Sequence, residues 1–230
     1  MSTSSFSRRS SLRWLAGAGG AAAAITLLGE PLIAQRAVAQ QAVPGIFGSV
    51  EVPNKGLQPF PQWAGALQRF FEEAGKAQQG CTPSATNKCH YATWAKLITD
   101  SKAKDIGAQI QGVNDFMNQA PYVVDMINWG VNDYWSSPGQ FFEKFGDCED
   151  YAIAKFLTLR ALGVPSANMR IVALTDLNLK VAHAIAAVYI SGKILVMDNQ
   201  IKPVVDSTTI KHYLPLYSVN EEGWWLHRPA

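Results

Sequence analysis

A cysteine surrounded by acids is the first feature of this chain that could do chemistry. It lies in Gly146-Asp147-Cys148-Glu149-Asp150, directly before a strongly helical stretch, and His183 and Asp198 follow in two short β-like runs joined by a turn. A thiol at the start of a helix, with an imidazole and a carboxylate on neighbouring strands, is the arrangement that a cysteine hydrolase needs. We therefore predict that Cys148, His183 and Asp198 are the catalytic residues.

The position of Cys148 favours a reactive thiol. In the first turn of a helix, unpaired backbone N–H groups and the positive end of the helix dipole favour the thiolate, which is the nucleophilic form. The same N–H groups can line an oxyanion hole. The alternative is a buried structural cysteine, the commonest fate of a free thiol. Three acidic neighbours argue against burial in an apolar site.

The pairing of His183 with Asp198 depends on the turn between their strands. A two-residue turn at Ser191-Gly192 would place Asp198 diagonally from His183 on the same face, within roughly 7–8 Å. There a carboxylate can orient a general-base imidazole. A three-residue turn would put the two residues on opposite faces, and a lone histidine on an apolar strand is often a satisfied core residue.

The acids beside the cysteine oppose its reactivity. The negative charges of Asp147, Glu149 and Asp150 raise the pKa of a neighbouring thiol. A bound cation would remove this conflict, and closely spaced carboxylates are oxygen ligands suited to Ca²⁺. Alternatively, Asp147 caps the helix while Glu149 and Asp150 complement its dipole. The sequence alone does not decide between these two interpretations.

Hydrophobic periodicity predicts helices followed by an antiparallel sheet. Helical spacing favours helices at 61–79, 91–99, 104–118 and, behind a capping box at Ser137–Gln140, 138–144. Residues 151–162 are apolar nearly all round, which predicts a helix buried at the centre of the domain. Period-two runs then predict strands at 169–175, 182–190, 193–198, 217–219 and 224–227. This order indicates an α+β fold.

The first 39 residues have the features of an export signal. Arg8-Arg9 precedes an apolar stretch of about 16 residues, and Ala37-Val38-Ala39 is a small-residue cleavage site. The paired arginines indicate the twin-arginine route to the periplasm. An uncleaved membrane anchor is the alternative. We expect residues 40–60, which hold three prolines and no periodicity, to form an extended arm or linker, and residues 61–230 to form a single domain.

Charge and cysteine usage limit the partners and cofactors. Cleavage after Ala39 leaves 16 basic and 17 acidic side chains, so the mature chain offers no electrostatic case for nucleic acid, and we expect no membrane insertion. Cys81 and Cys89 bracket a short polar loop and would close a disulfide in an oxidising compartment. A zinc site at these cysteines and His90 is the alternative, but it lacks a fourth ligand.

The cysteine motif also carries a family resemblance. Gly-Asp-Cys-Glu-Asp-Tyr-Ala-Ile-Ala-Lys (146–155), Leu162-Gly163-Val164 and the upstream stretch Trp129–Trp135 resemble the bacterial transglutaminase-like cysteine peptidases. The resemblance covers roughly residues 110–200. It implies a papain-like fold, a triad of Cys148, His183 and Asp198, and calcium held by the acidic residues beside the cysteine.

The same resemblance implies a biological setting. Characterised members of this family are periplasmic proteases that cleave large surface adhesins near a di-alanine and so release cells from biofilms. An inner-membrane receptor for a cyclic dinucleotide sequesters the protease. Two other functions fit the residues: an acyltransferase that passes a glutamine acyl group to an amine through the same triad, and a non-catalytic binding module that keeps the fold.

Overall fold

Two stretches of the chain, residues 45–74 and 90–230, are described by the computed structural model. The export signal, Cys81 and Cys89 lie outside them, so the signal, the disulfide and the zinc alternative stay predictions. Within the described residues, no helix is long and apolar enough to cross a membrane.

Six helices occupy the first part of the described chain, and most lie where periodicity predicts them. They are α1 (Pro61–Ala74), α2 (His90–Ser101), α3 (Ile106–Met117), α4 (Asp125–Asn128), α5 (Pro138–Lys144) and α6 (Cys148–Ala161). The predicted capping box at α5 is present, because Ser137 and Gln140 bond each other's backbone. The short helix α4 was not predicted, since four residues are too few to show a helical period.

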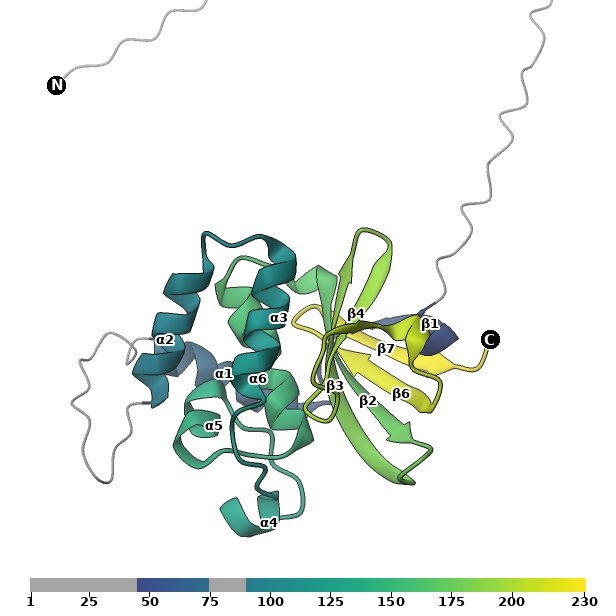
Figure 1. Ribbon diagram of the computed structural model, residues 1–230. Helices are drawn as coiled ribbons and strands as arrows, with labels where there is room; N and C mark the ends of the chain where they lie inside the picture. Colours follow the sequence, from purple (N-terminus) through teal and green to yellow (C-terminus); the bar gives the residue numbers. More distant parts are fainter. Residues whose placement is uncertain (1–44, 75–89) are drawn as a thin grey trace, which may run out of the picture. The chain divides into compact units, whose positions relative to one another are not determined.

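Helix α6 is the centre of the molecule, as its apolar sequence predicts. All its residues from Asp150 to Leu159 are buried. It packs against β2 and β3 on one side and against α3 and α5 on the other. Figure 1 shows the helices gathered on one face of the sheet. The first residue of α6 is Cys148, so the rigid core itself carries the thiol.

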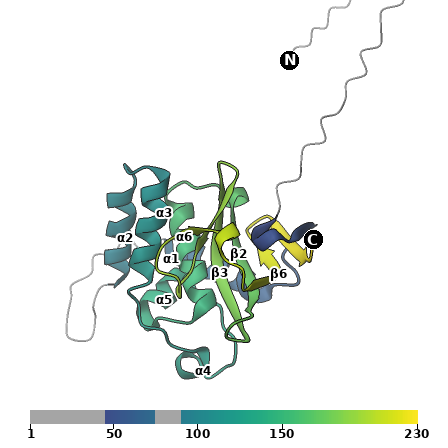
Figure 2. The same cartoon turned by 45° about the vertical axis from the view of Figure 1, so that its right-hand side comes forward.

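A seven-stranded antiparallel sheet forms the second part. Its strands are β1 (Val50–Lys55), β2 (Met169–Asp176), β3 (Val181–Ile190), β4 (Lys193–Met197), β5 (Val205–Asp206), β6 (Tyr213–Val219) and β7 (Gly223–Arg228), in the order β1-β7-β6-β2-β3-β4-β5. Figure 2 shows β2 and β3 lying next to the helices. The α+β prediction is confirmed.

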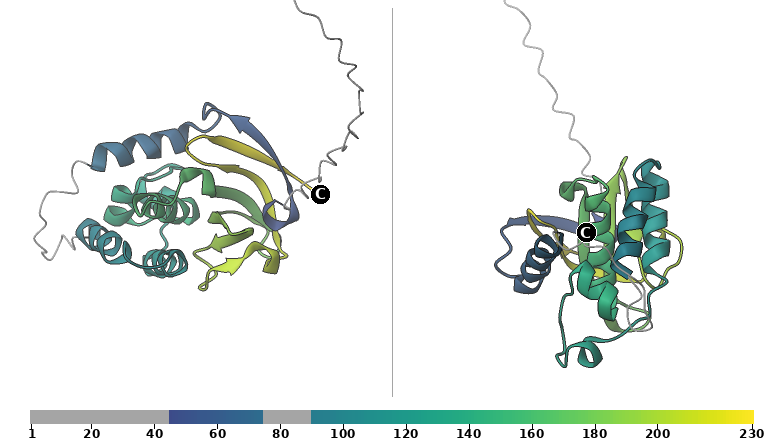
Figure 3. Two further views of the ribbon diagram at one scale, coloured as in Figure 1. Left: turned by 90° about the horizontal axis from the view of Figure 1, so that it is seen from above. Right: turned by 90° about the vertical axis from the view of Figure 1, so that its left-hand side faces the viewer.

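Strand β1 differs from the extended arm expected for residues 40–60. Val50–Lys55 pair along their whole length with β7, and Figure 3 shows the two strands side by side. The strand was missed because Pro53 breaks the usual strand signal. Proline cannot donate to a ladder but is tolerated on edge strands, and β1 is an edge of this sheet. The domain therefore begins before residue 61.

The hairpin of β3 and β4 has the predicted two-residue turn. Ser191 and Gly192 have φ angles of 50° and 74°, as a type I′ hairpin turn requires. Ile190 is opposite Lys193, and the ladder continues only to Ala186 opposite Met197. Beyond this pair β4 ends, while β3 continues to Val181 along β2. The edge of β3 near His183 is thus free of β4.

Candidate active site

The thiol of Cys148 meets the sheet at this free edge of β3. The backbone N–H of Ala184, the residue after His183, lies near the Cys148 sulfur. The thiol in turn donates to a carboxylate oxygen of Glu149, with Sγ and Oε2 3.2 Å apart. The nucleophile is half-buried at the start of α6 and adjoins the strand that carries the predicted base.

His183 and Asp198 form a buried pair. Nε2 of His183 lies 3.0 Å from Oδ1 of Asp198, and both side chains are almost fully shielded from solvent. The Asp198 carboxylate also accepts from the Gln200 backbone N–H at 2.8 Å and from the Tyr213 hydroxyl at 2.7 Å. Asn118 donates to the Asp198 backbone carbonyl at 2.8 Å. Every oxygen of Asp198 therefore has a donor.

These bonds fix the charge of Asp198 and the role of each imidazole nitrogen. Burial alone would raise the pKa of Asp198, but hydrogen bonds from His183, Gln200 and Tyr213 outweigh it and hold the pKa below its usual value. An ionised Asp198 can only accept, so Nε2 of His183 carries a proton. Nδ1 is then the nitrogen that can take the proton of a thiol.

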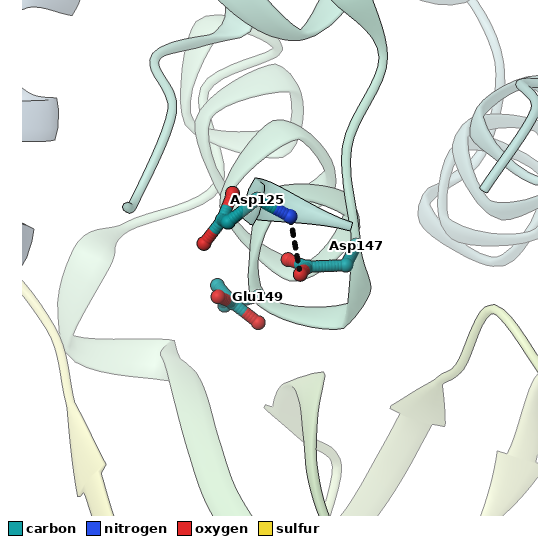
Figure 4. A group of neighbouring side chains, drawn as sticks. All are labelled: Asp125, Asp147 and Glu149. Carbon is teal, nitrogen blue, oxygen red and sulfur yellow. Dashed lines mark hydrogen bonds between the residues drawn. The ribbon is translucent and has the colours of Figure 1, made fainter. Parts of the chain in front are cut away.

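The carboxylates beside the thiol form a group that differs from the predicted set in one member. Oxygens of Asp125, Asp147 and Glu149 all lie within 4.8 Å of one another, and Figure 4 shows these side chains facing a common space. Asp150 does not join them. Its Oδ1 accepts from the Ser136 backbone N–H at 2.6 Å and ties α6 to the preceding loop.

A backbone bridge brings Asp125 to the group. Tyr122 and Gly146 form an isolated parallel bridge, and the Val123 N–H donates to the Gly146 carbonyl at 2.9 Å. The bridge aligns the start of α4 with the start of α6. No spacing rule links Asp125 to Asp147, 22 residues further on, so the sequence gives no signal for this contact.

Some carboxylate oxygens of the acidic group lack hydrogen-bond donors. Buried oxygens of Asp125 and Asp147 (Oδ1 in each) have no hydrogen-bond partner among the described residues. Burial raises the pKa of Asp125 to about 6 and, with the charge of Asp147, that of Glu149 to about 9. The pKa of Asp147 is raised as well, chiefly by burial.

These features favour a cation over the helix-capping interpretation for Asp147. Its side chain makes no capping bond to α6; instead it accepts from the Asp125 backbone N–H at 3.4 Å. Unpartnered, mutually repelling oxygens are what a hard cation such as Ca²⁺ satisfies. Three carboxylates supply part of a six- to eight-oxygen shell and leave room for water or backbone ligands. The residues present thus fit calcium.

The neighbouring acids also affect the pKa of the Cys148 thiol. Burial, the charge of Glu149 and the bond from the thiol to its carboxylate raise the pKa of Cys148, and Asp147 adds to the rise. The nearby Ala184 N–H works in the opposite direction. Without a cation the thiol therefore keeps its proton and shares it with Glu149 instead of His183.

The comparisons with known proteins give the family of the chain. A family model for the bacterial transglutaminase-like cysteine proteinases matches residues 78–228. Among solved structures, LapG of Legionella pneumophila is 34% identical and aligns with a TM-score of 0.59, covering 68% of this chain and 87% of that one. Two further structures of LapG, one calcium-bound and one EGTA-treated, align with the same identity and TM-score. The comparison with curated proteins gives no match.

Proposed function

The chain belongs to the bacterial transglutaminase-like cysteine proteinases, and on that basis we propose that it is an exported, calcium-dependent endopeptidase acting through Cys148, His183 and Asp198. Membership makes it a cysteine peptidase with a protein substrate. The observation that carries the catalytic assignment is the buried His183–Asp198 pair, because Ala184, the residue after His183 on β3, lies near the Cys148 sulfur.

Each residue has one task in this mechanism. Nδ1 of His183 takes the thiol proton, and the thiolate of Cys148 attacks the peptide carbonyl carbon. The C–N bond breaks as the leaving amine takes the proton from His183, which leaves an acyl-enzyme. Water, deprotonated by the same imidazole, then releases the acid and restores the thiol. Asp198 holds the ring and stabilises its protonated form.

The calcium dependence is supported by the acidic group and by the calcium-bound and EGTA-treated forms of LapG. Asp125, Asp147 and Glu149 would hold the ion. Calcium bound there supplies positive charge that offsets the repulsion between these carboxylates and a thiolate. If Glu149 held the ion, its carboxylate would no longer compete with His183 for the thiol proton.

The substrate and location complete the proposal. The signal at residues 1–39 supports the periplasm, and the family resemblance supports a large surface adhesin as substrate and an inner-membrane receptor as regulator. Cell fractionation with and without Arg8→Lys and Arg9→Lys tests the export route. Retention of the double variant in the cytoplasm is the expected result.

Incubation with a surface-protein fraction tests the activity. The mature protein in calcium should cleave a large surface protein, whereas Cys148→Ala or EGTA should leave that protein intact. Calcium should restore cleavage after EGTA better than magnesium does, because magnesium demands a strict octahedral shell. A labelled amine in the same reaction separates the two chemistries, since its incorporation without cleavage would indicate an acyltransferase. If neither cleavage nor amine incorporation were observed, the binding-module alternative would remain.

A further inference from the structure

Gln200 contacts the imidazole nitrogen that the proposed mechanism needs, yet it has no task in that mechanism. Its side-chain Nε2 lies 3.5 Å from Nδ1 of His183. Because Nε2 of His183 faces Asp198 and carries the ring proton, Nδ1 accepts this hydrogen bond. In the resting protein, an amide therefore occupies the nitrogen that should take the Cys148 proton.

The main chain of Gln200 is held in place while its side chain is exposed. Its backbone N–H donates to Oδ1 of Asp198 at 2.8 Å, the same oxygen that faces His183. The residue belongs to the loop after β4 and is exposed to solvent. A hydrogen bond of 3.5 Å is long, so it holds the amide at Nδ1 only weakly. The side chain can therefore leave the imidazole while its backbone stays beside the His183–Asp198 pair.

Peptide cleavage requires the amide to leave Nδ1. Once the thiol proton has reached Nδ1, the leaving amine must come within about 2.6–3.2 Å of that nitrogen to receive it. The Gln200 amide lies close to this position in the resting protein. The residue that follows the scissile bond therefore displaces it. The displaced carboxamide offers donors and an acceptor, which match the C=O and N–H groups of a peptide main chain.

A cavity of about 500 Å³ has Gln200 in its wall. It lies between the end of α3 and the loop after β4 and is lined by Asp115, Asn118, Gln119, Asn199, Gln200 and Lys202. Four of these six side chains are carboxamides, and the one acid is balanced by the one base. Asn118 also donates to the Asp198 backbone carbonyl at 2.8 Å, which ties the cavity wall to the triad. Carboxamides both donate and accept, so this lining suits an uncharged polypeptide segment.

We propose that Gln200 is a substrate-binding residue and that the cavity beside it takes the uncharged polypeptide segment that follows the scissile bond. When substrate binds, the Gln200 amide leaves Nδ1 of His183 and donates to a main-chain carbonyl of that segment. The vacated Nδ1 takes the Cys148 proton and later gives it to the leaving amine, so no proton leaves Gln200. This inference rests on the proposed function.

Gln200→Ala tests the inference with two substrates that share one acyl half. The first is a quenched peptide that spans the site cleaved in the surface-protein fraction. The second ends at that site in a coumarin amide, which has no main chain beyond the scissile bond. With calcium bound, Gln200→Ala should lose about fivefold to tenfold in kcat/KM on the spanning peptide, the equivalent of one hydrogen bond, and keep the wild-type value on the coumarin amide. Both leaving groups take their proton from His183, so a role in holding that imidazole would lower both values equally.

Product binding gives a second measurement. The peptide released from the leaving side should inhibit the wild-type enzyme, and its Ki should rise by the same factor in Gln200→Ala. Gln68→Ala, which removes an exposed carboxamide on α1, is the matched control and should behave as wild type. Equal losses on both substrates, an unchanged kcat/KM on the spanning peptide, or an unchanged Ki would overturn the assignment. Full activity in Cys148→Ala would instead overturn the proposed function.

Discussion

The two sides of the active site differ in how their charges are satisfied. On the sheet side, Asp198 has a donor for each oxygen, and its pKa lies below the ordinary value. On the helix side, Asp125, Asp147 and Glu149 crowd together with raised pKa values and unpartnered oxygens. The protein itself satisfies the oxygens on the first side, whereas buried oxygens of Asp125 and Asp147 on the second side have no hydrogen-bond partner among the described residues.

This difference indicates where the proposed calcium dependence would act. His183 and Asp198, the proposed base and its orienting acid, are held by the β3–β4 hairpin and by the bond from Tyr213 to Asp198. The Cys148 thiol instead donates a hydrogen bond to Glu149, a member of the acidic group. A cation that engages Glu149 changes the nucleophile without moving the base. Under the proposed calcium dependence, control would act on Cys148 and leave the His183–Asp198 pair as it is.

Removal of the nucleophile should give the largest effect. Cys148→Ala should abolish cleavage and leave the fold intact, because the side chain is small and half-buried. His183→Ala should lower kcat nearly as far, since the proposed base is lost. Cleavage assays and circular dichroism measure both results. Full turnover by Cys148→Ala would refute the catalytic assignment.

Substitutions in the acidic group should have the second-largest effect. They should also distinguish the residues that bind calcium from Asp150. Asp125→Asn and Glu149→Gln should abolish activation by calcium and its stabilisation of the fold, because each removes a charged ligand. Asp150→Asn is the matched control: it retains the acceptor for the Ser136 N–H, so it should keep the calcium response. Calorimetric titration and melting with and without calcium report the outcome. Loss of calcium binding in Asp150→Asn alone would restore the set predicted from the sequence.

Changes on the sheet side should be smaller and independent of calcium. Asp198→Asn disturbs the orientation and charge of His183 but keeps the base, so some activity should remain. Tyr213→Phe removes one bond to the carboxylate and should lower kcat by about tenfold, in line with a hydrogen bond to a charged group. Kinetics at saturating calcium and in EGTA measure both effects. A calcium affinity altered by Tyr213→Phe would show that the two sides are coupled.

The smallest expected effect is the pH dependence of folding stability in the absence of calcium. The pKa is raised to about 6 for Asp125 and about 9 for Glu149, so the folded state binds protons that the unfolded state has lost. These groups therefore favour folding at low pH, and their contribution is lost as pH rises from about 4 through 6 toward 9. Melting temperature in EGTA should fall over that window. Calcium should flatten the curve, and a flat curve in EGTA would contradict the raised pKa values.

Much of this protein follows from local sequence. The nearly all-apolar run after Cys148 predicts a buried helix, and the Ser191-Gly192 turn sets the register of β3 and β4. That register alone is enough to place His183 and Asp198 on one face of the hairpin. Periodicity and turn chemistry act over a few neighbouring residues, which is why the α+β class, the helix of Cys148 and the hairpin of His183 can be predicted from the chain.

Tertiary structure alone decided the rest. Asp125 joins the acidic group through the Tyr122–Gly146 bridge, and Tyr213 reaches Asp198 from another strand. Asp150 is adjacent in sequence to Glu149 but turns toward Ser136. Such contacts depend on how separate segments pack, and no local period encodes that packing. The sequence by itself determined the helix that begins at Cys148 and the β3–β4 hairpin that carries His183. Long-range packing determined which carboxylates lie beside the thiol.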